Sequence, residues 1–94
     1  MNFGEAIEAM KAGKRVARKG WNGKNMFVFL VNGSVVPREN LRGACAVAVE
    51  ASVNTAPVQD ICSHIDMMAA DGSIVIGWLA SQTDMLAEDW SVLV

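Results

Sequence analysis

The chain has 94 residues, of which 52% are hydrophobic and 19% are charged, and a formal net charge of −2. This length allows one domain with a modest core, because small domains bury a smaller share of their surface than large ones. No apolar run approaches the roughly 20 residues of a membrane span, and a pI near 5.2 argues against a large nucleic-acid footprint.

The composition also predicts location and assembly. The first residues do not form a signal peptide, because Asn2, Glu5 and Glu8 interrupt them, and we therefore expect a cytoplasmic protein. The hydrophobic surplus, in a chain without a repeat or a disulfide framework, predicts a homo-oligomer whose subunits cover one another.

Two cysteines and one histidine are the soft metal ligands of the chain. Cys45, Cys62 and His64 follow no zinc-binding spacing, so we expect no metal ion and no cofactor. The cysteines are predicted to be buried, reduced thiols, as free cysteines usually are in a cytoplasm.

The first predicted element is an amphipathic helix at the N-terminus. Apolar residues recur at helical spacing at Phe3, Ile7 and Met10. Asn2 followed by Glu5 has the form of a capping box, in which two side chains satisfy free N–H groups at the start of a helix. Gly13 is expected just past the end of the helix.

A three-strand meander is predicted to follow. Its strands are residues 15–19, 26–31 and 34–36, joined by a loop at 20–24 and a turn at Asn32-Gly33. The first loop also contains Asn22-Gly23, and this dipeptide favours hairpins because both residues tolerate a positive φ.

The stretch 37–60 allows two interpretations. Pro37 suits the first turn of a helix that runs through Leu41 to about Val49. The alternation of alanine with Cys45, Val47 and Val49 also suits a strand. We favour the helix.

The last part of the chain predicts a hairpin, a short helix and a strand. The expected elements are strands at 61–68 and 73–78 around an Asp-Gly turn, a helix to about Glu88 and a strand over 90–94. Ser81 is the expected N-cap, with Asp84 three residues later. Residues 1–94 are thus predicted to form a single small α+β domain, with an antiparallel sheet and its helices packed on one face.

Basic residues crowd one short segment, which predicts a locally basic surface at the N-terminal hairpin. They are Lys11, Lys14, Arg15, Arg18, Lys19 and Lys24. Trp21 lies among them, and a ring that stacks on a base beside cations that attract phosphate suits a nucleotide. Alternatively, Trp21 folds back onto the core or into a subunit interface, and spacing alone leaves both interpretations open. Trp78 and Trp90 are expected in the core.

The residues do not predict a catalytic site. Cys62 and His64 lie two apart on one strand face, but nothing nearby completes a nucleophile-and-base device. Asp66 shares that face and would suit acid–base work with Asp84, although Asp84 already has a structural role at the start of a helix. No glycine-rich phosphate loop is present. We therefore expect a protein that is not an enzyme.

Four sequence blocks resemble one family. They are MNFGEA at 1–6, ARKGWNGK at 17–24, HIDM at 64–67 and GWLASQTDMLAEDW at 77–90. Together and in this order they resemble the Thoeris anti-defense two family of phages and prophages. The segment 34–60 shows the least of the family pattern.

The resemblance implies a compact α+β subunit that assembles into a homotetramer, with ligand pockets at subunit junctions. It also implies a sponge for immune signals. Such proteins bind and sequester the glycocyclic ADP-ribose signals of Thoeris defence, and some relatives also hold cyclic oligonucleotides of CBASS defence. No bond in the signal is broken.

The resemblance also implies which residues contact the signal. Trp21 would stack on an adenine, and Arg18 would face a pyrophosphate. By motif position, the further contacts are Asn22, Phe27, His64, Asp66, Gln82, Thr83 and Asp84. A carboxylate such as Asp66 or Asp84 accepts hydrogen bonds from ribose hydroxyls, and free N–H groups after Ser81 meet phosphate.

Three alternatives stay open. A nucleic-acid-binding module would use the basic hairpin, and its affinity would fall steeply with salt. A partner-binding protein would present Trp21 to another chain. A small nucleotide enzyme would use His64, Asp66 and Asp84 and would release a changed product.

Overall fold

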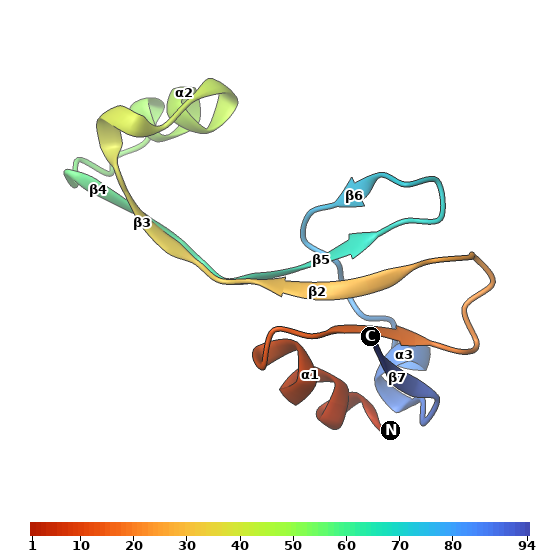
Figure 1. Cartoon of the computed structure of the whole chain (residues 1–94). Helices are drawn as coiled ribbons and strands as arrows, with labels where there is room; N and C mark the ends of the chain where they lie inside the picture. The colour runs from red at the N-terminus through yellow and green to blue at the C-terminus, as the bar shows by residue number, and fades with distance from the viewer. The chain divides into compact units, whose positions relative to one another are not determined.

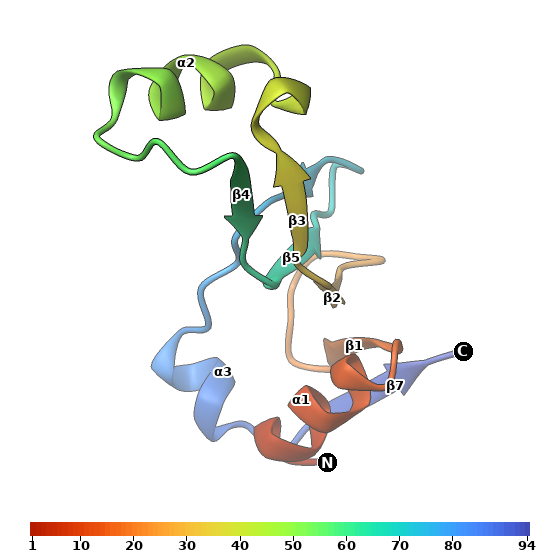
Figure 2. The same cartoon turned by 90° about the vertical axis from the view of Figure 1, so that its left-hand side faces the viewer.

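The computed structural model describes the whole chain, residues 1–94, with three α-helices and seven β-strands. Its contacts define two compact units: unit 1 comprises Met1–Val31 and His64–Val94, and unit 2 comprises Asn32–Ser63. Figures 1 and 2 show the elements of both units. The prediction of an α+β fold with antiparallel sheets is confirmed.

Unit 1 begins with helix α1, Phe3–Lys11, as the capping box predicts. The Asn2 side chain accepts a hydrogen bond from the Glu5 backbone N–H (2.8 Å), and the Glu5 carboxylate accepts one from the Asn2 N–H (2.9 Å). Gly13 follows the helix with φ +87°, a left-handed conformation that glycine adopts without a Cβ clash. Both ends of α1 therefore follow from local sequence.

A five-stranded antiparallel sheet has the order β6-β5-β2-β1-β7. Its strands are β1 (Arg15–Arg18), β2 (Phe27–Val31), β5 (His64–Met68), β6 (Ile74–Val75) and β7 (Trp90–Leu93). The central pair is β2 and β5, which align from Phe27 opposite Met68 to Val31 opposite His64. In contrast, β1 pairs with β2 at a single position.

The core of unit 1 lies between this sheet and the helices α1 and α3 (Gln82–Leu86), which Figures 1 and 2 show on the same side of the sheet. Its buried members are Ala6, Met10, Val16, Val28 and Trp90. Burying one aliphatic side chain of this kind stabilises a fold by about 1.5–3 kcal/mol. These few residues supply the apolar burial that holds unit 1 together.

The C-terminal elements confirm their sequence signals. Ser81 accepts a hydrogen bond from the Asp84 N–H, and the Asp84 carboxylate accepts one from the Ser81 N–H, so α3 begins with a capping box. Trp90 is buried at the start of β7 and donates its indole N–H to the Asp84 carbonyl at 2.9 Å. Trp78 is half-buried against the same core. Core packing is thus confirmed for both tryptophans.

Unit 2 is a two-stranded ribbon that carries a helix. Strands β3 (Ser34–Pro37) and β4 (Val58–Ile61) pair antiparallel, and between them lie a 3₁₀ turn, Arg38–Asn40, and helix α2, Gly43–Ala51. Figure 2 shows α2 beyond the end of the ribbon. None of the residues of this unit is buried.

The predicted meander is wrong at its third strand. β3 pairs with β4 and not with β2, whose second neighbour is β5. Asn32-Gly33 is therefore not the turn of a β2–β3 hairpin. The alignment of β2 with β5 places Leu30 opposite Ile65, and both side chains pack against the core. This non-local apolar pairing outweighs the local turn signal.

The loop between β1 and β2 also departs from its prediction. The positive φ expected at Asn22-Gly23 occurs instead at Asn25, with φ +62°. The strands that this loop joins are not aligned closely enough for a two-residue turn, because β1 ends at Arg18 and β2 begins at Phe27.

The helix favoured after Pro37 forms, but it begins later than predicted. Residues 38–40 make a 3₁₀ turn, and α2 starts at Gly43, whose φ of +61° interrupts a helix begun at Pro37. The predicted strand 61–68 is two strands, because β4 ends at Ile61 and β5 begins at His64.

Two further findings concern side chains and helix length. The prediction of buried thiols is wrong: Cys45 lies on α2 and Cys62 follows β4, and both are exposed because unit 2 has no core to cover them.

None of the helices combines the length and apolar character needed to cross a bilayer.

Candidate functional site

One face of the five-stranded sheet carries the polar and aromatic residues of interest. Side chains alternate across a strand, so Phe27 and Phe29 lie on the opposite face to Val28, which is in the core. Their cross-strand partners Met68 and Asp66 share that face. We call this side, away from α1 and α3, the open face.

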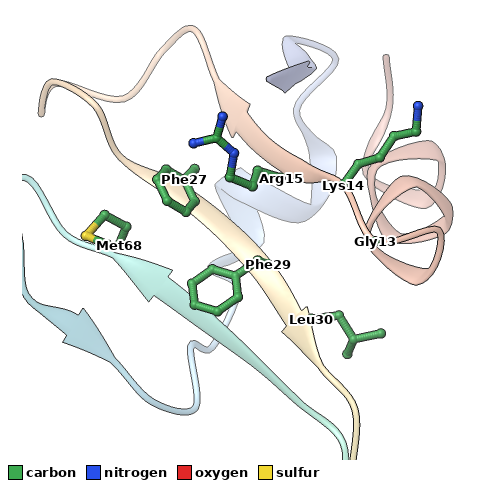
Figure 3. Close-up of a pocket in the computed structure, with 7 residues that line it drawn as sticks. All are labelled: Gly13, Lys14, Arg15, Phe27, Phe29, Leu30 and Met68. Atoms are coloured by element: carbon green, nitrogen blue, oxygen red, sulfur yellow. The ribbon is translucent and has the colours of Figure 1, made fainter. Parts of the chain in front are cut away.

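A hollow of about 290 Å³ occurs where β1 and β2 diverge (Figure 3). It is lined by Gly13, Lys14, Arg15, Phe27, Phe29, Leu30 and Met68. The strands pair at Val16 opposite Val28 and not beyond, which leaves room between Lys14 and Leu30. We call this space the Phe27 hollow.

The Phe27 hollow combines aromatic rings with cations. The rings of Phe27 and Phe29 are 5.9 Å apart at a tilt of 52°, and the Arg15 guanidinium lies 4.8 Å from the Phe27 centroid. Lys14 is exposed and has no carboxylate partner, and Figure 3 shows it where the chain passes from Gly13 into β1. Arg15 also donates a hydrogen bond to the Val94 oxygen at 3.2 Å. Aromatic faces stack on flat bases and exposed cations attract phosphates, so this arrangement suits a nucleotide.

A second hollow, of about 340 Å³, contains Trp21. It is lined by Ala17, Arg18, Lys19, Trp21, Gly23, Asn25, Met26, Ser91 and Leu93. Leu93 is the cross-strand partner of Arg15, which lines the Phe27 hollow. The two hollows therefore adjoin across β1, and Lys19 adds an exposed cation to the second one.

Arg18 is held inside the protein by two carboxylates. Its Nε donates to Asp89 Oδ1 and its Nη1 donates to Asp84 Oδ1, each at 2.8 Å. The hydrogen bonds to Asp89 and then to Asp84 raise the pKa of Arg18, and those from Arg18 hold the pKa of Asp89 below its ordinary value. The predicted pyrophosphate contact of Arg18 stays a prediction, and its guanidinium already serves these two partners.

Asp84 is the centre of this cluster. Besides Arg18, the Trp21 indole N–H donates to Oδ1 (3.1 Å), and the Ser81 N–H donates to Oδ2 (3.3 Å). Burial raises the pKa of Asp84, but the hydrogen bonds from Arg18, Trp21 and Ser81 outweigh burial and hold that pKa below its ordinary value. Both oxygens of this carboxylate therefore already have donors.

Trp21 packs against the core of unit 1. Its ring is half-buried, 5.3 Å from Trp90 and 6.2 Å from Trp78, both edge to face. The alternative, that Trp21 folds back onto the core, is what the structure shows. The ring still lines the second hollow, so a stacking role stays a prediction.

His64 and Asp66 form a hydrogen-bonded pair on the open face. His64 Nδ1 lies 2.7 Å from Asp66 Oδ1, and the Gly77 N–H donates to the same oxygen at 3.0 Å. Burial raises the pKa of Asp66, but the hydrogen bonds from His64 and Gly77 outweigh burial and hold that pKa below its ordinary value. Asp66 is thus an ionised, buried carboxylate that accepts from two protein donors.

The remaining predicted contacts are exposed. Asn22 lies in the loop between β1 and β2, and Gln82 and Thr83 occupy the first turn of α3 next to Asp84. The structure thus brings Arg18, Trp21 and Asp84 into one cluster, whereas Phe27, His64 and Asp66 belong to the open face. No three His, Cys, Asp or Glu side chains lie close enough together to hold a metal ion.

The profile of the Thoeris anti-defense 2-like domain (Tad2-like) matches residues 1–93. The chain belongs to the Thoeris anti-defense 2 family. The match treats these residues as one domain, and it confirms the resemblance seen in the four sequence blocks.

A phage relative supports the same assignment. The protein named Thoeris anti-defense 2 of Bacillus phage SP01 is 39% identical over 93 residues, which cover 99% of this chain and 94% of that protein. The Tad2-like chain is therefore similar to a phage anti-defence protein over nearly its whole length.

Four residues of the Phe27 hollow in this Tad2-like chain were not among the predicted ligand contacts. They are Lys14, Arg15, Phe29 and Met68. Period-two alternation in β2 is the signal that pairs Phe29 with Phe27. Met68 gave no such signal, because its place beside Phe27 depends on the pairing of β2 with β5.

Proposed function

We propose that this Tad2-like protein is a phage anti-defence protein that captures a nucleotide-type immune signal and holds it without cleaving it. The signal class is the glycocyclic ADP-ribose of Thoeris defence, and cyclic oligonucleotides of CBASS defence are the second class to test. The observation that carries the proposal is the Phe27 hollow, where two aromatic rings lie beside the exposed cations Lys14 and Arg15.

The Phe27 hollow suits both kinds of group in such a signal. Phe27 and Phe29 offer ring faces to an adenine, and Arg15 and Lys14 offer charge to a pyrophosphate. The second hollow, which contains Trp21, adjoins the Phe27 hollow and has room for the remainder of a bulky cyclic ligand. A sponge needs about 12 kcal/mol for nanomolar holding, and side chains fixed on a sheet lose little entropy on binding.

The polar side chains near the hollows are arranged for binding a signal without cleaving it. His64 is hydrogen-bonded to Asp66, and no hydroxyl or thiol is hydrogen-bonded to the ring as a nucleophile. The carboxylates of Asp84 and Asp89 are engaged by Arg18. These groups are arranged to hold one another and a ligand.

We further propose a homotetramer in the host cytoplasm, with signal pockets completed at subunit junctions. Support comes from unit 2, whose helix α2 is almost entirely apolar and has no buried residue. A helix that is apolar all round is ordinarily covered by protein. Val47 of this helix is 70% exposed in the single chain, and other subunits would cover such surface.

The decisive experiment is release of the captured signal. The purified protein is mixed with glycocyclic ADP-ribose isomers and cyclic oligonucleotides, free ligand is removed, and the protein is denatured for mass spectrometry. Recovery of an intact signal supports sequestration. A changed product means an enzyme. Recovery of nothing, with no thermal stabilisation, rejects the proposal in favour of a nucleic-acid or partner-protein ligand.

A matched pair of variants tests the site. Lys14→Gln removes an unpaired cation from the Phe27 hollow, and we expect about tenfold weaker binding, because hydrogen bonds to charged groups contribute about 1.5–3 kcal/mol. Lys11→Gln is the control, since Lys11 lies at the end of α1, contacts Glu8 and lines neither hollow. Equal loss in both variants would contradict the assigned site.

A further inference from the structure

We infer that Asp66 fixes His64 in the tautomer with a proton on Nδ1, and that His64 Nε2 then accepts a hydrogen bond from the captured nucleotide. This inference rests on the proposed function, and it gives the two residues different roles. His64 is the ligand contact, and Asp66 is a positioning residue that acts through it.

The first step concerns which atom carries the proton. Asp66 is ionised, and a carboxylate without a proton is only an acceptor. The 2.7 Å contact between Asp66 Oδ1 and His64 Nδ1 therefore requires a hydrogen on Nδ1. In the neutral ring, this leaves the lone pair on Nε2.

The second step concerns the rigidity of the pair. The Asp66 side chain is 5% exposed, and the Gly77 backbone N–H donates to the same oxygen that contacts His64. The following residue, Trp78, donates its N–H to the Ile65 carbonyl at 2.7 Å, so this segment is bound twice to β5. The acceptor that fixes the imidazole is therefore itself held in place.

The third step concerns what Nε2 can meet. The His64 side chain is 30% exposed, and Nε2 makes no hydrogen bond to the protein. His64 stands opposite Val31, and Asp66 stands opposite Phe29 of the Phe27 hollow. An acceptor on the open face beside the aromatic rings is thus available to a ligand.

These steps specify the chemistry of the bound group. A phosphate would meet a lone pair and the nearby Asp66 charge, so a donor is needed at Nε2: a ribose hydroxyl or an exocyclic amine of a base. The phosphates are then left to Lys14 and Arg15, on the β1 side of the hollow. The nucleotide is predicted to lie across the strands, with its anionic part toward β1 and a donor group toward β5.

The chain offers a direct test because His64 is its single histidine. In ¹⁵N-labelled protein with a neutral ring, the two imidazole nitrogen shifts report the tautomer once couplings to the ring C–H protons identify Nδ1 and Nε2. We expect the proton on Nδ1, and saturation with glycocyclic ADP-ribose should shift Nε2 more than Nδ1. A proton on Nε2 overturns the inference, and so does an Nε2 resonance that stays unmoved while the nucleotide is bound.

Variants separate positioning from contact. Asp66→Asn presents an amide that can donate to Nδ1, and it therefore favours the tautomer with the proton on Nε2. We expect the shift typical of a protonated nitrogen to move from Nδ1 to Nε2, and binding to weaken about tenfold. His64→Leu should weaken binding equally. His64→Gln, whose side-chain oxygen reaches near the Nε2 position, should restore part of it. No rescue by Gln, or unchanged binding in His64→Leu, overturns the contact.

Two ligand analogues identify the donor. An inosine counterpart lacks the adenine amine, and a deoxyribose counterpart lacks one hydroxyl. The donor group is the one whose removal weakens binding to the wild-type protein but not to His64→Leu. If both analogues bind the wild type as tightly as the parent nucleotide does, the inference is overturned. If no nucleotide is retained by the wild type at all, the proposed function fails first, and that result is distinct from a bound nucleotide with an unmoved Nε2.

Discussion

Units 1 and 2 differ in how they are held together. All buried side chains lie in unit 1, including the core residues Val16, Val28 and Trp90, whereas none lies in unit 2. Unit 2 has 32 residues from Asn32 to Ser63, fewer than the roughly 40 below which a chain usually needs disulfides, metals or a partner. The comparison teaches that the apolar core and the candidate site both belong to unit 1, while unit 2 has no core of its own.

The amino acids explain this difference. In β1 and β2, residues that face the core alternate with residues on the open face. Apolar burial on the core side offsets the conformational entropy that the chain loses on folding. Helix α2 has the sequence GACAVAVEA, in which small side chains bring little apolar area to any one face. Its order comes from hydrogen bonds such as those of Arg38 to the Val49 and Asn54 carbonyls.

The largest difference in stability is expected between a variant in the core of unit 1 and a variant at an exposed position of unit 2. Trp90→Ala should destabilise the protein by about 3–5 kcal/mol, because it opens a cavity and removes the indole bond to the Asp84 carbonyl. Val53→Ala, at a fully exposed position of unit 2, should change stability by less than about 0.5 kcal/mol. Urea unfolding of both variants checks this, and similar losses would show that unit 2 is as well packed as unit 1.

A second contrast concerns arginines. Arg18→Met leaves Asp84 and Asp89 without their shared donor, and we expect a clear drop in melting temperature. Arg42→Met removes only bonds to the nearby Glu39 and Leu41 carbonyls and should leave the melting temperature nearly unchanged. Thermal scans at one protein concentration compare the two variants. An unchanged melting temperature in Arg18→Met would show that the ion pairs with Asp84 and Asp89 do not stabilise the protein.

Acid should affect unit 1 through the same carboxylates. The pKa values of Asp66, Asp84 and Asp89 are lowered by folding, so their contribution is present above the unfolded pKa of about 3.9 and is lost as the pH falls through the lower folded values. Stability should therefore decline as the pH drops below about 4. Asp89→Asn should flatten this decline in chemical denaturation at several pH values, and an unchanged slope would contradict the assignment.

The smallest effect is expected from excising unit 2. Val31 and His64 are cross-strand partners, so replacing Asn32–Ser63 by Asn-Gly would close β2 and β5 with a two-residue turn. We expect unit 1 to fold cooperatively, with native-like circular dichroism. A shortened chain that is unfolded at all temperatures would show that unit 1 needs unit 2, and the comparison would have to be abandoned.

Local elements of this chain were predictable to different degrees. The capping boxes at Asn2 and Ser81 and the left-handed Gly13 follow from residues a few positions apart, and all of them form. The hairpin of β5 and β6 follows its Asp-Gly signal, with Gly72 at φ +87°. The predicted meander was wrong because a turn signal indicates where the chain bends but not which strand pairs with the strand before the bend.

The candidate site was predictable in part for the same reason. The sequence named Phe27, His64 and Asp66, and the structure puts all of them on one sheet face. The family resemblance also implied ligand contacts at Arg18 and Trp21, but the distant Asp84 accepts hydrogen bonds from both. Asp89 accepts a further hydrogen bond from Arg18. Charge and spacing identify such residues without showing which of them are already paired.

The sequence by itself determined the fold class, the helix ends, the core tryptophans and the family. Those features depend on neighbouring residues or on patterns within one element. Only the tertiary structure decided that β5 lies beside β2, that Arg18 is shared by two carboxylates, and that Lys14 and Arg15 border the Phe27 hollow. These depend on contacts between distant residues, whose free energy is set by the whole packing arrangement rather than by local preference.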